Sequence, residues 1–124
     1  MTGVPSGEPS TTGLAPNVAS ALSYLAGPFS GVLLVLAERT NPTVRFHAWQ
    51  SIIGLGGLGV LVAVLILSAF AAIVVSAALF KALLYAGWAV WIGWIVLWVV
   101  CIVKAYQGQR WKLPLVGDYA ERFI

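Results

Sequence analysis

The residues best suited to chemistry are concentrated in one short stretch, RFHAWQS. Arg45, His47, Gln50 and Ser51 lie within seven residues, and positions 47, 50 and 51 share one face of a helix. Polar side chains at a membrane edge reach lipid headgroups, whereas deeper ones face a bundle interior or a water-filled cavity. The stretch therefore predicts either an interfacial anchor or a functional polar cluster.

The same stretch lacks a complete catalytic or metal-binding set. His47 is the only histidine and Cys101 the only cysteine, and their separation argues against a metal site built from both residue types. Ser51 follows His47 by four positions, but no acid is placed to orient the histidine and no oxyanion donors are identifiable. We therefore expect a protein that is not an enzyme and that carries no cofactor and no metal.

Composition indicates that these residues are carried by membrane-embedded elements. The chain of 124 residues is 60% hydrophobic and 9% charged, whereas soluble domains are roughly 45–50% apolar and about 25% charged. A soluble domain of this size could not bury so much apolar surface. The seven basic residues form no dense patch, which argues against nucleic-acid binding. The expected partners are the lipid bilayer and other membrane proteins or a second copy of the chain.

Charge-free runs predict an all-α integral membrane bundle of three transmembrane helices. Residues 18–37 form the first run, and twenty helical residues reach ~30 Å, about one hydrocarbon thickness. The expected spans are about 18–37, 47–69 and 82–104. They form a membrane domain over residues 17–124. Residues 1–16, rich in Gly, Pro, Ser and Thr, are expected to be disordered.

The boundary between the second and third spans is the least defined. Residues 46–80 carry no Lys, Arg, Asp or Glu, and one helix of that length would reach ~52 Å, too long for a simple span. Residues 60–80 also lack Gly, Pro, Asn and Asp, so a turn signal is missing. We favour a short interfacial helix between the two spans, with one long tilted helix as the alternative.

The distribution of basic residues predicts the topology. With three spans, the loop at 38–46 and the tail at 105–124 lie on one side. That side carries six basic residues, counting Lys104, and the other side carries only Lys81. This bias predicts a multi-pass protein of the plasma membrane with the N-terminus outside and the C-terminus in the cytoplasm.

Small residues mark the faces on which helices could approach closely. Ser23, Gly27 and Gly31 recur at intervals of four in the first predicted span, and Gly54 and Gly57 stand in the second. Such stripes are typical of close helix packing in membranes. Packing within the chain and dimerisation both remain open.

Three short motifs carry a resemblance to a known family. RFHAWQ (Arg45 to Gln50), KAYQG (Lys104 to Gly108) and LPLVGD (Leu113 to Asp118) resemble small membrane proteins related to the Tic-twenty component of chloroplast protein import. The resemblance covers about residues 17–121. It implies a compact helical membrane domain, although the chloroplast relative is usually described with four spans and this chain fits three better.

The motifs and the charge bias together suggest a functional polar cluster on the cytoplasmic side. Arg45 and His47 are expected to meet the 104–118 segment, with Gln107 and Asp118 as partners. The full candidate cluster is Arg45, His47, Gln50, Lys104, Gln107 and Asp118. The function expected is that of a non-enzymatic membrane protein acting through helix packing and protein partners, in protein translocation or membrane organisation. The alternative is an oligomeric channel or transporter subunit.

Overall fold

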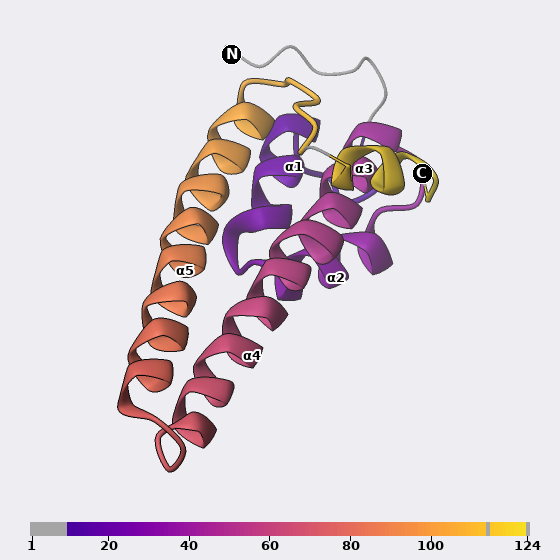
Figure 1. Ribbon diagram of the computed structural model, residues 1–124. Helices are drawn as coiled ribbons and strands as arrows, with labels where there is room; N and C mark the ends of the chain where they lie inside the picture. Colours follow the sequence, from indigo (N-terminus) through magenta and orange to yellow (C-terminus); the bar gives the residue numbers. More distant parts are fainter. Residues whose placement is uncertain (1–9, 114, 124) are drawn as a thin grey trace. The chain divides into compact units, whose positions relative to one another are not determined.

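A computed structural model describes residues 10–113 and 115–123, and in that part of the chain every regular element is helical (Figure 1). The expected all-α class is thus confirmed. The elements are α1 (Pro16–Leu25), α2 (Pro28–Ala37), α3 (Pro42–Gln50), a π-helical stretch η1 (Ser51–Leu55), α4 (Gly56–Ala72), α5 (Ala77–Tyr106) and α6 (Val116–Glu121).

The chain divides into two compact units. The head unit comprises residues 10–56 and 98–123 of the described chain, and the hairpin unit comprises Gly57–Leu97. The head unit contains α1, α2, α3, η1, α6 and the last turns of α5. The hairpin unit contains most of α4 and α5.

In the hairpin unit, α4 and α5 run side by side and are joined by a short turn (Figure 1). Residues 73–76 form this turn, and the Ser76 hydroxyl accepts a hydrogen bond from the Leu79 backbone N–H at 3.2 Å, as an N-cap does. The interfacial helix expected between the second and third spans is therefore corrected to a tight turn. Ser76 was the available sequence signal, because serine favours a helix N-cap even where Gly, Pro, Asn and Asp are absent.

Two helical stretches in the described residues are long and apolar enough to cross a membrane. They are Pro42–Ala72, which joins α3, η1 and α4, and Ala77–Tyr106, which is α5. The expectation of three spanning helices is not confirmed, because residues 18–37 do not form one helix. They form α1 and α2, each of ten residues, and ten residues reach only ~15 Å.

The break between α1 and α2 lies at Ala26 and Gly27. Gly27 has φ 61° and ψ −139°, a conformation that glycine adopts far more readily than other residues. Pro28 then occupies the first turn of α2, where its missing N–H costs nothing. The Gly-Pro pair thus ends one helix and starts the next, instead of kinking a continuous span.

The two short helices return the chain to its starting side within the head unit. The Glu38 carboxylate, directly after α2, accepts hydrogen bonds from Thr11, which precedes α1. The N-terminus was expected on the side opposite the C-terminal tail. That expectation required one continuous helix over 18–37, which the break at Gly27 rules out. Of the segment 1–16 expected to be disordered, residues 1–9 lie outside the described residues, and Ser10 and Thr11 contact Glu38.

The small residues selected from sequence have different environments. A Cβ on Gly31 would lie 2.8 Å from the Ala48 carbonyl oxygen, and one on Gly54 would lie 2.7 Å from Leu113. Both glycines therefore allow close packing within the chain. A Cβ on Gly57 would meet nothing within 4 Å. Ser23 is buried and its hydroxyl donates to the Ala19 carbonyl at 3.1 Å.

Substitution of Gly31 tests the contact between α2 and α3. Gly31→Ala should lower the stability by about 1–3 kcal/mol, because the new methyl group meets backbone that has to shift. Gly57→Ala is the matched control and should be neutral or stabilising, since its site is open and alanine favours a helix. The measurement is the thermal unfolding midpoint in detergent. Equal midpoints for the two variants would contradict the packing described.

Candidate functional site

The centre of the head unit is a buried hydrogen-bonded chain of three polar side chains. Gln50 donates through Nε2 to the Tyr24 hydroxyl at 3.0 Å, and that hydroxyl lies 2.7 Å from Nδ1 of His47. All three side chains have an exposed fraction of 1% or less. Because Gln50 donates to the tyrosine oxygen, the hydroxyl can donate its own proton to Nδ1. That arrangement leaves the imidazole proton on Nε2.

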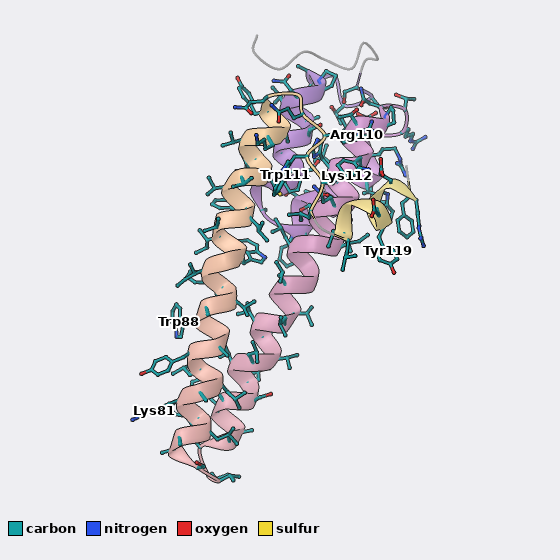
Figure 2. The ribbon with its side chains drawn as sticks, turned by 45° about the horizontal axis from the view of Figure 1, so that its top comes forward. Lys81, Trp88, Arg110, Trp111, Lys112 and Tyr119 are labelled. Carbon is teal, nitrogen blue, oxygen red and sulfur yellow. The ribbon has the colours of Figure 1, made fainter. Side chains whose placement is uncertain are left out.

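Gln50 also holds the C-terminal tail against α3. Its Nε2 donates to the Trp111 carbonyl at 2.9 Å, and its Oε1 accepts from the Leu113 N–H at 3.0 Å. One amide thus pairs with the backbone of two tail residues, as a neighbouring strand would. Figure 2 shows Trp111 on the tail segment that carries these contacts.

Arg45 and Asn41 organise the loop before α3. The Arg45 guanidinium donates to the Glu38 carbonyl at 2.7 Å and to the Val35 carbonyl at 3.3 Å. It thereby satisfies carbonyls at the end of α2. Asn41 caps α3 by accepting from the N–H groups of Thr43 and Val44.

The Glu38 carboxylate connects the residues before α1 to the loop between α2 and α3. It accepts from the backbone N–H of Thr11, Thr40 and Asn41 and from the hydroxyls of Ser10 and Thr11. Burial by itself would raise the pKa of this carboxyl. The hydrogen bonds, led by those from Ser10 and Thr11, outweigh burial and lower the pKa to about 2.

The KAYQG motif ends α5 with a Schellman turn. Gly108 has φ 79°, its N–H donates to the Ala105 carbonyl at 3.0 Å, and the Gln109 N–H donates to the Lys104 carbonyl at 3.0 Å. The conformation at Gly108 redirects the chain from the helix into the tail. The motif is thus accounted for by backbone geometry.

The tail forms its own charged and aromatic contacts. Lys112 lies 2.5 Å from Glu121 and 3.8 Å from Asp118, and the hydrogen bond to Glu121 raises the lysine pKa. The Arg110 guanidinium donates to the Thr43 hydroxyl at 2.8 Å and lies 5.5 Å from the Phe46 ring centroid. The first turns of α3, which belong to the segment 38–46, and the tail are therefore neighbours, as the charge argument expected.

The structure joins only part of the predicted cluster. His47 and Gln50 share the buried chain, and Gln50 meets the tail. The named partners Gln107 and Asp118 are corrected, because Arg45 contacts the Val35 and Glu38 carbonyls and Asp118 pairs with Lys112. His47 contacts Tyr24 and does lie beside the 104–118 segment, close to the Gln109 backbone. Gln107 and Lys104 contribute backbone groups to the end of α5, and the Gln107 side chain is exposed.

Two residues central to this site were not selected from the sequence. Glu38 could have been found, because it is the only acid between residues 9 and 117. Tyr24 gave no such signal, because a tyrosine in an apolar run is equally typical of a membrane interface. Its role depends on the break after α1, which brings α1 against α3.

The chemistry available at this site is mainly that of fold stabilisation. Among residues 10–113 and 115–123, no group of three His, Cys, Asp or Glu side chains is placed to hold a metal ion. Nε2 of His47 is buried without a hydrogen-bond partner in the described chain. The other polar atoms of the three-residue chain are satisfied by protein groups.

Comparison with known proteins gives the family. The model of the magnetosome magnetite crystal formation protein family matches residues 10–120. The chain belongs to this family. A UPF0132 membrane protein of Methanocaldococcus jannaschii is 38% identical over 115 residues, which is 90% of each chain. A UPF0132 membrane protein of Archaeoglobus fulgidus is 39% identical over 109 residues, 87% of this chain and 94% of the relative. No solved structure matches this chain significantly.

These relatives correct the resemblance drawn from the short motifs. The family model and the archaeal proteins account for nearly the whole chain, and no link to the Tic-twenty component is shown. The short motifs were a poor guide to the family because their residues have structural roles that occur in many proteins, such as the helix end at Gly108. The expectation of a membrane protein is confirmed, because the relatives are named as membrane proteins.

A pH titration of folding tests the role of Glu38. The folded pKa of about 2 lies below the ordinary value of 4.5, so the carboxylate stabilises the fold above about pH 4.5. This stabilisation is lost as pH falls towards 2. The thermal midpoint of wild type should therefore exceed that of Glu38→Gln at pH 7, and the difference should shrink between pH 4.5 and 2. A constant difference would contradict the assignment.

Exchange of amide hydrogens tests the Gln50 clamp. Gln50→Ala should lower the stability of the docked tail by about 1–3 kcal/mol, because the Leu113 N–H and the Trp111 carbonyl lose their partner. Deuterium uptake over residues 109–113 should rise. Gln107→Ala is the control, since that side chain is exposed, and it should leave the uptake unchanged. Unaltered uptake in Gln50→Ala would show that other contacts hold the tail.

Proposed function

We propose that this chain is a non-enzymatic integral membrane protein that organises a membrane by packing its exposed helices against other membrane polypeptides. The support is the contrast between its two units. The head unit buries polar groups such as His47 and Gln50, while the hairpin unit exposes large apolar side chains such as Leu67, Phe70 and Trp88. A helix that is apolar all round is suited to a lipid or protein-filled membrane interior.

The observation that carries the proposal is an exposed face of α4 made of Gly, Ala, Ser and Val residues, here called the small-residue face because none of its side chains is larger than valine. Its members recur at intervals of three and four, which places them on one side of the helix. All five are exposed in the described chain: Gly57, Val60, Val64, Ser68 and Ala71. Small side chains let another helix approach closely, and a serine can hydrogen-bond across such an interface. The proposed partner is a transmembrane helix from a second copy or from a different protein.

The proposed membrane arrangement has two spans. The helical stretches Pro42–Ala72 and Ala77–Tyr106 cross the bilayer, and α1 with α2 enters from one side and returns to it. Thr11 and Glu38 then lie on the same side as the tail. The positive-inside bias favours the cytoplasm for that side and the plasma membrane as the location. The proposal includes no protein translocation, because that suggestion depended on the corrected resemblance.

The family's printed description concerns magnetite crystal formation in magnetosomes. We do not carry that role over to this chain, and the proposed membrane organisation rests on the exposed helices alone. No metal site is proposed, and the relatives from archaea are named only as membrane proteins.

Cysteine labelling tests the arrangement of the spans. In a Cys101→Ser background, Leu14→Cys and Gln107→Cys should react with a membrane-impermeant thiol reagent from the same side. Val74→Cys, in the turn between α4 and α5 and 88% exposed, should react from the other side. Labelling of positions 14 and 107 from opposite sides would restore three spans and contradict the proposal.

Site-specific photo-crosslinking in native membranes tests the partner. A photoreactive residue at Val64, on the small-residue face, should yield discrete protein adducts. The control position is Ile92 on α5, which is 58% exposed and lies on the other helix; it should yield mainly lipid adducts. The absence of protein adducts at position 64 would sink the proposed function, while adducts of twice the chain's mass would identify a second copy.

A further inference from the structure

The hairpin unit contains an apolar groove between α4 and α5. Its volume is about 330 Å³, at the lower end of the ~300–1,000 Å³ typical of small-molecule sites. Ile66 and Phe70 from α4 and Leu84, Trp88 and Trp91 from α5 are among its lining residues. Such a lining offers an acyl chain an apolar surface with two large aromatic rings.

The groove is shaped by a close approach and by paired rings. A Cβ on Gly87 would lie 2.6 Å from Ile66, so the glycine lets the two helices converge at the base of the groove. The Trp88 and Trp91 rings meet edge to face, with centroids 5.6 Å apart. Towards the turn, Phe70 and Phe80 are in contact, with centroids 5.8 Å apart. Phe70, Trp88 and Trp91 thus contribute aromatic surface to the groove.

Lys81 supplies a charge on α5 three residues before the lining residue Leu84, on the side of the groove nearer the turn. At 100° per residue, positions 81 and 88 lie within about 20° of each other on α5, and Figure 2 shows Lys81 and Trp88 projecting from the same side of the helix. Lys81 is exposed and makes no ion pair with any described residue. Its ammonium can extend towards the headgroup region while its stem covers apolar surface. Tyr85, 67% exposed and four residues on, is a typical interfacial aromatic.

We propose that this groove binds one anionic phospholipid from the leaflet on the turn side. The phosphate pairs with Lys81, and one acyl chain lies against Trp88 and Trp91 between α4 and α5. The proposal rests on the two-span arrangement but not on the small-residue face of α4. An apolar groove alone would accept any lipid. The unpaired ammonium at its end selects an anionic headgroup.

Tryptophan quenching in vesicles tests the site. The protein is reconstituted in phosphatidylcholine vesicles that contain phosphatidylglycerol as a minor component. In one sample the phosphatidylglycerol carries dibrominated acyl chains. In the other sample an equal mole fraction of the phosphatidylcholine carries them. The signal of the Trp88→Phe/Trp91→Phe variant is subtracted, so that quenching at these two residues is isolated. Dibrominated phosphatidylglycerol should quench with about fivefold higher apparent affinity than dibrominated phosphatidylcholine, because one basic residue near a membrane surface favours an anionic lipid by about that factor.

Two charge variants complete the test. Lys81→Gln should remove the preference, while Lys104→Gln, at the opposite end of α5, should preserve it. Equal quenching by both lipids, a preference that survives Lys81→Gln, or no quenching by either lipid would overturn the lipid site. Labelling of the Leu14→Cys, Val74→Cys and Gln107→Cys variants, reconstituted in the same vesicles, separates these outcomes from a failure of the proposed topology.

Discussion

The head unit depends on repairing a broken helix inside apolar surroundings. Where α1 ends and α2 begins, backbone carbonyls lose their helical partners, and such groups are costly when neither water nor protein satisfies them. Side chains from α2, η1 and α5 supply the donors. Trp98 of α5 donates to the Tyr24 carbonyl at 2.7 Å, and Ser51 of η1 donates to the Gly27 carbonyl at 2.8 Å. Ser30 of α2 donates to the carbonyls of Ser23 and Gly27.

This repair connects local conformation to the polar core. Because Ser51 reaches Gly27, the π-helical stretch η1 between α3 and α4 lies against the break, and Gly31 of α2 permits contact with Ala48 of α3. The same arrangement brings Tyr24 against His47 and Gln50. Gln50 then fixes the tail through Leu113. A single turn at Gly27 is thus connected, through the side chains of Ser51, Tyr24 and Gln50, to the docking of the C-terminal segment.

The two units divide the physical tasks of a membrane protein. The head unit satisfies many of its buried polar groups internally, so its short helices and loops can exist near or within the apolar layer. The hairpin unit has few polar groups to satisfy and exposes apolar side chains such as Val74 and Leu67. Membership of a family of membrane proteins agrees with this division. In the proposed arrangement, a partner helix or a lipid meets the hairpin unit through shape and isolated charges such as Lys81.

The sequence by itself determined the membrane class, the helical content and the proximity of the loop before α3 to the tail. Composition, charge-free runs and the placement of basic residues suffice for these features, because they follow from burial and electrostatics summed over many residues. It also selected His47 and Gln50, but not their partners. Only the tertiary structure decided that residues 18–37 turn back at Gly27 and that Tyr24 joins the polar core. It also decided that Glu38 connects the residues before α1 to the loop after α2. These outcomes depend on donors far away in sequence, such as Trp98 for the Tyr24 carbonyl. A local pattern cannot reveal whether a broken helix will find such donors.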